Sequence, residues 1–448
     1  MAKLLTRLII VSLCLVTALT GCESTQMAQK SNDNGNPSTN SNQSPNTTAI
    51  LSSMNLNTQV FKNQGDLAFV WQGLLYVLDG KTGEVKQLTK SGSVQHPAWS
   101  HDGEWIAYIS TNSPTNNSGQ IWIVRRDGQN AHQVEGQSFS WSPTSDVLAV
   151  SGTDGLWLAP VEGEAKLEIK GSVSYPSWSP DGKSIAYSVT LPFDKNNPEK
   201  RNDALYTLTL SSGNTVMQTT ASNAGIQFAR WWPNGDGLLY WSDPLHSASL
   251  AADGLGLMSL RLGDKEAKLL TTGLTYRSWL SVSPQGQLLA VTGGGRIVWA
   301  QKTLSNINVE AGTTRELPNP EGDVAIDPSL SKDGKNIAFV SAKNLGNSVW
   351  GFRKPEEFEN WIATRTLWIE DVDGSGAHPL KAAGTGVYQP VWSKDGTRIM
   401  YVRDNSLWII GANGENPEKI LGPFPGWEKD QFGFYGVICH DDFAWFQP

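Results

Sequence analysis

One short phrase recurs along the chain and constrains its fold more than any other feature. Each copy has a tryptophan or a residue in its place, then a turn resembling Ser-Pro-Asp-Gly, then a short apolar run. The seven copies begin at Pro97, Phe139, Pro176, Arg230, Leu280, Pro328 and Pro390. Strand-like sequence lies on both sides of each turn, and a period of ~40 to 60 residues is typical of stacked repeat architectures. The phrase therefore predicts a fold built from similar units.

The copy around Trp178 shows what one unit contains. Residues 175–179 and 185–189 read as two strands joined by Pro180-Asp181-Gly182, a sequence suited to a tight turn. Residues 205–210 and 216–220 read as a third and a fourth strand, joined at Ser212-Gly213. Four antiparallel strands make one propeller blade. The sequence thus predicts an all-β propeller.

An eighth, split unit is visible at the two ends of the repeat region. Residues 66–71, 74–79 and 85–89 read as second, third and fourth strands without a first strand, while residues 432–439 read as an extra strand after the last unit. We expect these N- and C-terminal strands to share one blade and close the ring. Eight four-stranded blades are favoured, and seven remain possible if the degenerate unit around Val282 is not a blade. In that unit, the third strand is expected at 296–301.

The N-terminal region reads as a targeting segment followed by a tether. Lys3 and Arg7 precede an apolar run over residues 8–18, which is too short to span a bilayer as a helix. Leu19-Thr20-Gly21-Cys22 resembles the lipobox of bacterial lipoproteins, and the alternative is an ordinary cleaved signal with a chance cysteine. We expect a signal peptide over 1–21, a lipidated Cys22 with a disordered tether over 22–58, and the propeller over 59–448.

Cysteine usage and charge limit the partners. Of the three cysteines, Cys14 leaves with the signal and Cys22 is expected to be lipidated, so Cys439 remains alone and no intramolecular disulfide is expected. The formal charge is −8, and loss of the two positive charges of the signal gives −10. An acidic protein without a basic run is a poor candidate for nucleic-acid binding. We expect a membrane-anchored protein outside the cytoplasm, at the outer leaflet or in the periplasm.

The repeats resemble a known family. Trp178-Ser179-Pro180-Asp181-Gly182, followed by Ile185-Ala186-Tyr187, is similar to the repeats of TolB-like propellers, which are shared with prolyl oligopeptidase-type peptidases. The related peptidases carry a hydrolase domain with a Gly-x-Ser-x-Gly turn, and this sequence lacks that motif. The resemblance therefore implies a binding or scaffold module for a protein, peptide or envelope polymer, without cofactor and not an enzyme. The alternative is a carbohydrate-active enzyme, since some TolB-like propellers are polysaccharide lyases that use histidines and a metal.

The longest loops predict where a partner binds. Residues 111–119, 190–204, 242–254 and 342–365 all connect a second to a third strand, so they lie on one face. Aromatic and basic residues in two of these loops have the composition of binding hot spots, and they form the candidate binding face: Phe193, Lys195, Arg201, Trp350, Phe352, Arg353 and Trp361. The alternative is that these insertions merely fold over a neighbouring loop. Residues 355–362 have the sequence of a short helix.

The histidines do not predict a metal site. The chain has six, and none of them follows a ligand spacing such as His-x-x-x-His. A propeller can still gather distant histidines near its axis, so the polar groups at the axial opening separate a binding module from an enzyme.

Overall fold

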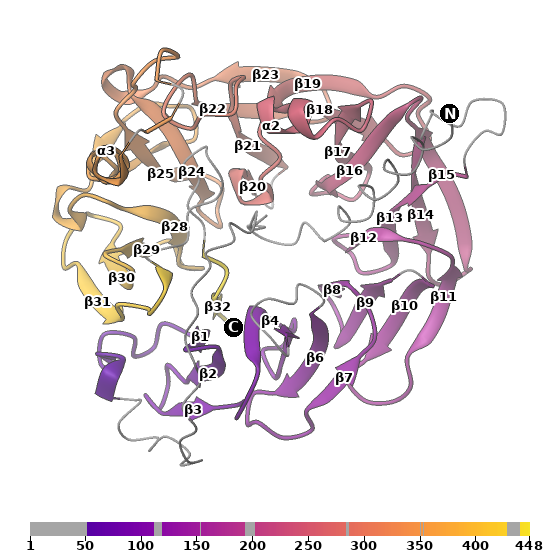
Figure 1. The fold of residues 1–448 in the computed structure, drawn as a ribbon, viewed down its shortest axis with the longest axis horizontal. Helices are drawn as coiled ribbons and strands as arrows, with labels where there is room; N and C mark the ends of the chain where they lie inside the picture. The colour runs from indigo at the N-terminus through magenta and orange to yellow at the C-terminus, as the bar shows by residue number, and fades with distance from the viewer. Residues whose placement is uncertain are drawn as a thin grey trace, which may run out of the picture.

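The computed structural model describes residues 52–111, 119–152, 154–192, 202–283, 286–349, 351–352, 354–427 and 440–448. Eight four-stranded antiparallel sheets stand around a central axis, with the first strand of each sheet innermost (Figure 1). The fold is therefore the predicted eight-bladed propeller.

The blades follow one another along the chain. Blade 1 consists of β32 (Phe443–Phe446), β1 (Asp66–Trp71), β2 (Leu74–Leu78) and β3 (Val85–Gln87). Blades 2 to 4 consist of β4 (Ser93–Trp99), β5 (Trp105–Thr111), β6 (Gln120–Arg125) and β7 (His132–Val134); β8 (Ser138–Trp141), β9 (Val147–Ser151), β10 (Gly155–Pro160) and β11 (Lys166–Lys170); and β12 (Ser174–Trp178), β13 (Ser184–Thr190), β14 (Asp203–Thr209) and β15 (Asn214–Thr220).

The second half of the ring repeats this order. Blades 5 and 6 consist of β16 (Ala224–Trp231), β17 (Gly237–Pro244), β18 (Leu255–Arg261) and β19 (Lys268–Gly273); and β20 (Leu280–Val282), β21 (Gln287–Thr292), β22 (Thr303–Asn308) and β23 (Thr313–Glu316). Blades 7 and 8 consist of β24 (Val324–Leu330), β25 (Asn336–Ala342), β26 (Thr366–Asp371) and β27 (His378–Pro379); and β28 (Tyr388–Trp392), β29 (Arg398–Arg403), β30 (Ser406–Gly411) and β31 (Glu418–Leu421). The helices are α2 (Ala248–Asp253), α3 (Pro355–Ile362) and the 3-10 turns η1 (Arg277–Trp279), η2 (Pro320–Gly322) and η3 (Lys381–Ala383).

The repeated turn between the first and second strands is held by its own side chains. In blade 4, the Ser179 hydroxyl donates to Asp181 Oδ1 at 2.7 Å and accepts from the Ser184 amide, while Asp181 Oδ1 accepts from the Lys183 amide. Gly182 has a φ of 69°, a backbone conformation that residues other than glycine rarely adopt. The hydrogen bond from Ser179 holds the pKa of Asp181 below its usual range. The same bonds recur at Asp102, Asp333 and Asp395.

Tryptophans of the innermost strands join neighbouring blades. The indole nitrogen of Trp178 donates to the Ser140 carbonyl of the preceding blade at 2.9 Å. Four other blade junctions have an equivalent bond, from Trp99 to Ala444, Trp141 to Ala98, Trp231 to Ser177 and Trp392 to Ser329. The repeated tryptophan thus fixes the distance between adjacent inner strands.

Apolar side chains of the two middle strands fill the spaces between blades. Between blades 1 and 2, for example, Val70, Val77, Ile106 and Val124 are buried in one cluster. Similar clusters lie between neighbouring blades from blade 2 to blade 6, and one larger cluster extends over blades 6, 7, 8 and 1. Each blade therefore depends on both of its neighbours for burial.

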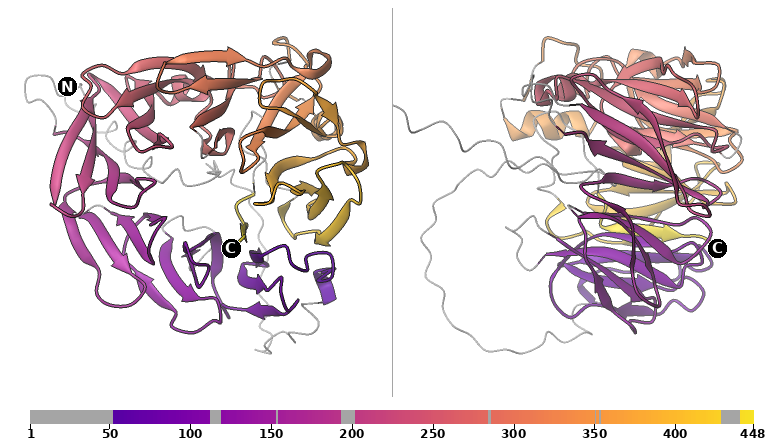
Figure 2. Two further views of the ribbon diagram at one scale, coloured as in Figure 1. Left: turned by 180° about the vertical axis from the view of Figure 1, so that it is seen from behind. Right: turned by 90° about the vertical axis from the view of Figure 1, so that its right-hand side faces the viewer.

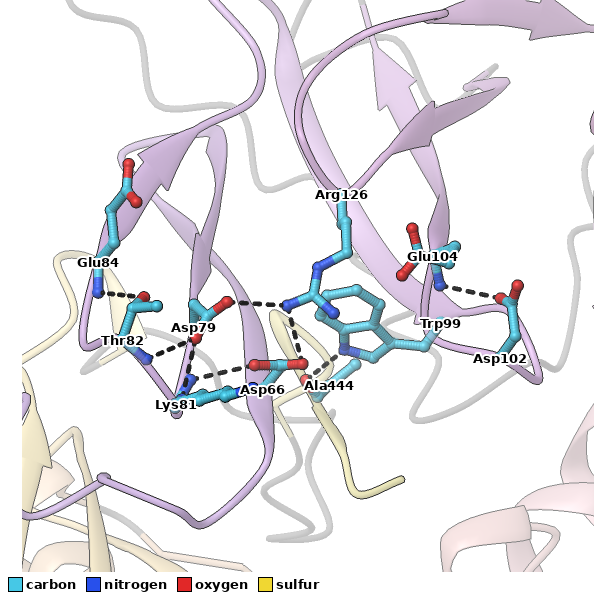
Figure 3. Close-up of polar contacts among 11 residues, drawn as sticks. Asp66, Asp79, Lys81, Thr82, Glu84, Trp99, Asp102, Glu104, Arg126 and Ala444 are labelled. Atoms are coloured by element: carbon cyan, nitrogen blue, oxygen red, sulfur yellow. Dashed lines mark hydrogen bonds and ion pairs between the residues drawn. The ribbon is translucent and has the colours of Figure 1, made fainter.

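The ring closes at blade 1, where β32 pairs antiparallel with β1. An ion-pair junction supports this closure from blade 2 (Figure 3): the Arg126 guanidinium lies 2.9 Å from an Asp66 carboxylate oxygen, 3.2 Å from one of Asp79, and over the ring of Trp99. Because all three groups are partly buried, solvent screens this junction less than it screens an exposed ion pair. The prediction of a shared terminal blade is confirmed.

Two details of the strand prediction were wrong. The strand that pairs with β1 and closes the ring is β32, whereas the closing strand was expected at residues 432–439, all of which lie outside the described residues. The third strand of blade 6 is β22 rather than residues 296–301. That segment is a loop with Ile297, Val298 and Trp299 buried, and the Lys302 ammonium donates to the carbonyls of Gly294, Gly295 and Ala300 at 2.9–3.4 Å. The Lys302 side chain thus donates hydrogen bonds to backbone carbonyl groups that would otherwise need partners from a neighbouring strand.

The two long connections that contain helices lie on one face, as expected. Both α2 and α3 follow second strands and emerge on the same side of the ring (Figure 2). Residues 355–362 form α3, as predicted. The folded part also extends N-terminal to residue 59, because Met54 is buried and its carbonyl accepts from the Gly422 amide. None of the helices in the described ranges has the length and apolar character needed to cross a bilayer.

Removal of one interblade indole bond should lower stability. Trp178→Phe leaves the Ser140 carbonyl without its donor, so we expect a loss of about 1–2 kcal/mol in the free energy of unfolding, measured by urea denaturation. Trp122→Phe is the control, because no indole hydrogen bond is found for Trp122 among the described residues. Equal losses in the two variants would show that ring area rather than the hydrogen bond matters.

A buried carboxyl group should make stability depend on pH. Glu370 on β26 is 3% exposed, and neither of its carboxylate oxygens has a hydrogen-bond partner among the described residues. Burial, with smaller contributions from Asp371 and Asp373, raises its pKa from 4.5 to about 7. The folded state therefore holds this proton over a pH range in which the unfolded chain releases it, and stability falls as pH rises from about 4.5 to about 7.

Glu370→Gln should remove that dependence. We expect the variant to be more stable than the parent at pH 8, by up to about 3 kcal/mol, and nearly unchanged near pH 4.5. Urea denaturation at both pH values measures the difference. Glu316→Gln, at an exposed position on β23, is the matched control and should show no gain. A gain of equal size at both pH values would contradict the role of ionisation.

Candidate functional site

Four innermost strands carry a bulge at the same place. In β4, β12, β24 and β28 the strand register shifts around a residue followed by proline: His96-Pro97, Tyr175-Pro176, Asp327-Pro328 and Gln389-Pro390. Proline has no amide hydrogen, so it tolerates exclusion from the ladder. Each of the four residues lies three positions before the last residue of its strand. Because β4, β12, β24 and β28 are the innermost strands of their blades, the bulges place four equivalent residues around the axis.

The backbone at these four residues is strained. Their φ angles are 52° at His96, 56° at Tyr175, 50° at Asp327 and 50° at Gln389. A residue before proline favours extended conformations, and a non-glycine residue at positive φ costs on the order of 1–3 kcal/mol. Strain of this kind clusters at functional sites, and its repetition here identifies the axial ring, His96, Tyr175, Asp327 and Gln389, as the candidate site.

Asp327 is the centre of a buried polar network. Its carboxylate accepts from the Trp279 indole at 3.0 Å, and from the Arg365 guanidinium at 2.7 Å. Arg365 is 1% exposed and lies between the rings of Trp361 and Tyr388, each 5.6 Å away. Burial lowers the pKa of Arg365, and Asp327 opposes that shift. The ion pair fixes the Asp327 side chain, because separating either partner would leave a buried charge.

The next two positions of the ring contact the C-terminal segment. The side chain of Gln389 donates to the His440 carbonyl at 2.8 Å and accepts from the His440 amide at 2.7 Å. His96 Nδ1 lies 2.6 Å from a carboxylate oxygen of Asp441. Asp327, Gln389, Asp441 and His96 come from consecutive blades, so one side of the axis is polar and rich in carboxylates.

The opposite side has a different character. Tyr175 is half-buried, and the Arg277 guanidinium lies 5.6 Å from the centre of its ring.

A cavity of about 180 Å³ lies on the side of the axis that carries Asp327 and Gln389, between the inner parts of blades 6, 7 and 8. It is lined by Ser278, Trp279, Asp327, Pro328, Ser329, Gln389, Pro390 and Val391. Two ring members thus face a concave surface that combines apolar rings with carboxylate and amide groups.

The structure describes only part of the predicted binding face. Phe193, Lys195, Arg201, Trp350 and Arg353 lie outside the described residues. Trp361 is 2% exposed, packs against Trp299 and Phe358, and donates to the Lys343 carbonyl. Phe352 lies with its ring centre 4.4 Å from that of Trp299. These two residues fold over blade 6, as the alternative interpretation of the insertion expected.

Planar side chains connect this insertion with the closing blade. Beyond Arg365 and Tyr388, the His440 ring lies 5.4 Å from Tyr388 and 3.8 Å from Trp427. Phe424 stacks on Trp427 at 4.0 Å and lies 5.3 Å from Trp71 of β1. A continuous series of packed rings therefore links α3 to blade 1 beside the axial ring and supports the C-terminal segment that holds His96 and Gln389.

Sequence reasoning missed the axial ring, although a signal was present. The recurring phrase was read from its proline onward, as at Pro97 and Pro390. The residue just before that proline differs from copy to copy, whereas the proline and the following turn recur. A set of ligand contacts has this pattern: the polar or aromatic side chain differs between copies, while the backbone that presents it stays the same.

A group of three potential metal ligands lies away from the axial ring. In the described part of the chain, one group of three potential ligands lies close together: His101, Asp102 and Asp146, whose ligand atoms are all within 4.8 Å of one another. These residues lie in turns between first and second strands, away from the axial ring. A search for ligand spacings around each histidine could not find this group, because Asp146 comes from a different blade than His101.

Comparison with known proteins gives distant relatives, and no family model matches the chain. An uncharacterized protein of Agrobacterium fabrum is 27% identical over 144 residues, 27% of this chain and 48% of the relative. Dipeptidyl-peptidase 5 of Porphyromonas gingivalis is 24% identical over 37% of this chain and 20% of the peptidase. Tricorn protease homolog 1 of Streptomyces coelicolor is 21% identical over 62% of this chain and 24% of the relative. The chain spans about half or less of the length of these relatives.

One solved structure has a similar fold. A structure described as the eukaryotic initiation factor is 12% identical, covers 80% of this chain and 87% of its own, and has a TM-score of 0.51. TolB from Acinetobacter baumannii is 18% identical over 74% of this chain and 67% of its own, with a TM-score of 0.35. At these identities a structural likeness concerns the fold alone.

The expectation that the chain is not an enzyme is corrected. Two of the three relatives named above are peptidases. The expectation depended on the absence of a Gly-x-Ser-x-Gly nucleophile motif. That absence gives no information about catalytic side chains that the fold brings together from separate blades. The relatives therefore leave both binding and catalysis open to this propeller.

Proposed function

We propose that this protein is an extracytoplasmic binding module anchored by a lipid on Cys22, and that the axial ring contacts its ligand. The observation that carries this proposal is the strain repeated at His96, Tyr175, Asp327 and Gln389. Four equivalent positions have the same unfavourable backbone conformation, and each presents a different functional group. Pure packing would be served at lower cost by glycine at positive φ.

The chemistry of the ring favours an extended polymer with polar groups along its length. Carboxylate, amide and imidazole groups lie on one side of the axis, and Tyr175 with Arg277 lies on the other. A peptide or an envelope polysaccharide offers hydrogen-bond donors, acceptors and flat apolar surfaces to such a site. The buried Asp327–Arg365 pair holds its part of the site in place before a ligand arrives.

Tyr175→Gly separates a binding role from a structural one. The change relieves the strain at φ 56° but removes the ring, so we expect the free energy of unfolding to change by less than about 1 kcal/mol. Binding of soluble extended peptides or envelope polysaccharides, measured by fluorescence polarisation, should weaken at least about tenfold. Mass spectrometry of the same mixtures tests whether the ligand is cleaved.

The matched control for Tyr175→Gly is Asn130→Gly. Asn130 has a φ of 54° and lies between β6 and β7, on the face away from the long loops. Its replacement should relieve similar strain without a change in binding. If Tyr175→Gly binds every probe as tightly as the parent protein, the axial ring is not the binding site.

The anchor has a separate test. Cys22→Ser removes the thiol that an acyl chain requires, so the variant should move from the membrane fraction to the soluble fraction of cells. Fractionation followed by mass spectrometry of the N-terminal peptide measures both location and acylation. Membrane retention of the serine variant would contradict the lipid anchor but leave the axial site untouched.

A further inference from the structure

Two turns of adjacent blades bring an imidazole and two carboxylates together on the face away from the long loops. His101 and Asp102 lie in the turn between β4 and β5, and Asp146 lies in the turn between β8 and β9. His101 Nδ1 and Asp146 Oδ1 are 3.0 Å apart, and one ligand atom from each of the three residues lies within 4.8 Å of the others. This spacing allows a single ion to contact all three side chains.

The turn itself holds Asp102 in position. Its Oδ1 accepts from the Ser100 hydroxyl at 2.6 Å and from the Glu104 amide at 2.9 Å. Because the same bonds form at Asp181, Asp333 and Asp395, the turn orients this aspartate whether or not a ligand is bound. Hydrogen bonds of this kind orient carboxylate ligands in metal sites.

The charges of the group favour a cation. Asp102 and Asp146 each offer a carboxylate oxygen, and these two oxygens lie within 4.8 Å of each other. Two carboxylates at such a distance repel each other unless a proton or a cation lies between them. A divalent ion relieves that repulsion and replaces the hydrogen bond between His101 and Asp146 with coordination bonds.

The repeats provide an internal comparison. Positions are counted from the residue that begins each turn, which is Trp232 in blade 5 and a serine in the other turns compared. His101 and Asp102 are the first and second residues after Ser100, and Asp146 is the fourth after Ser142. The corresponding residues at the junction of blades 4 and 5 are Pro180, Asp181 and Asp236, which include no imidazole. At the junction of blades 7 and 8 they are Lys332, Asp333 and Thr397. The junction of blades 2 and 3 therefore differs from these two by its third potential ligand.

We propose that His101, Asp102 and Asp146 form a binding site for a divalent transition-metal ion that joins blades 2 and 3. One nitrogen and two oxygen ligands match Zn²⁺, which accepts both imidazole and carboxylate. His101 and Asp102 are exposed, so solvent molecules complete the coordination. The site is independent of the axial ring, because it lies in different turns and shares no residue with it.

Zinc binding by the metal-free protein, purified without a polyhistidine tag, tests this proposal. Isothermal titration calorimetry with Zn²⁺ should show one site, and Zn²⁺ should raise the midpoint of thermal unfolding in a manner that EDTA reverses. Asp146→Asn and His101→Gln should each weaken binding by about tenfold or more. Mg²⁺ and Ca²⁺, which prefer oxygen-only sites, should bind more weakly than Zn²⁺.

Two control variants separate this site from adventitious binding. Asp181→Asn removes the equivalent aspartate of blade 4, and His132→Gln removes another partly exposed histidine; both should bind Zn²⁺ as the parent does. Cooperative thermal unfolding of each variant without metal confirms that it is folded. The proposal is overturned if the parent binds no Zn²⁺ up to about 1 mM, a free energy near −4 kcal/mol, or if Asp146→Asn and His101→Gln bind as tightly as the parent.

Discussion

The contact between neighbouring inner strands is the constraint on which the whole ring depends. A single four-stranded blade cannot bury both of its faces, so each one is stable only between two others. The indole of Trp178 spans this gap to the Ser140 carbonyl, and four other junctions have the same bond. The aromatic ring contributes apolar contact, and its nitrogen fixes the register of one blade on the next. Tryptophan recurs at that position because one side chain provides both a large apolar contact and a directed hydrogen bond.

Much of the fold could be predicted because the turn carries its own stabilising bonds. The Ser179–Asp181 pair and Gly182 determine the hairpin from sequence neighbours alone, so the strands on both sides were found almost to the residue. The loop around Trp299 was misread for the opposite reason. Its apolar run resembles a strand, but its backbone carbonyl groups accept hydrogen bonds from the Lys302 side chain. No local sequence pattern predicts that contact. The closing strand was likewise displaced, since pairing between β32 and β1 joins the two ends of the domain.

The candidate site was harder to predict because it is assembled across blades. His96 and Gln389 are almost three hundred residues apart in the chain, and each has an ordinary local sequence. Their shared property is a positive φ before proline, which depends on the strand bulge and cannot be inferred from residue type. Five of the seven residues of the predicted binding face lie outside the described part of the chain, and the other two, Phe352 and Trp361, pack against the ring of Trp299. Trp361 lies at one end of a series of packed rings that continues through Arg365 and Tyr388, so its composition reflects packing.

Rigidity and strain are connected in this ring. A strained residue persists only where its surroundings hold it more strongly than the strain opposes it. At Asp327 that support comes from the buried Arg365, and at Gln389 from two hydrogen bonds with the His440 backbone. Both supports belong to segments outside the innermost strands: the insertion of blade 7 and the chain that leads into β32. The long-loop face and the ring closure therefore determine the geometry of the axial ring, and residues that touch no ligand can still control how well it is formed.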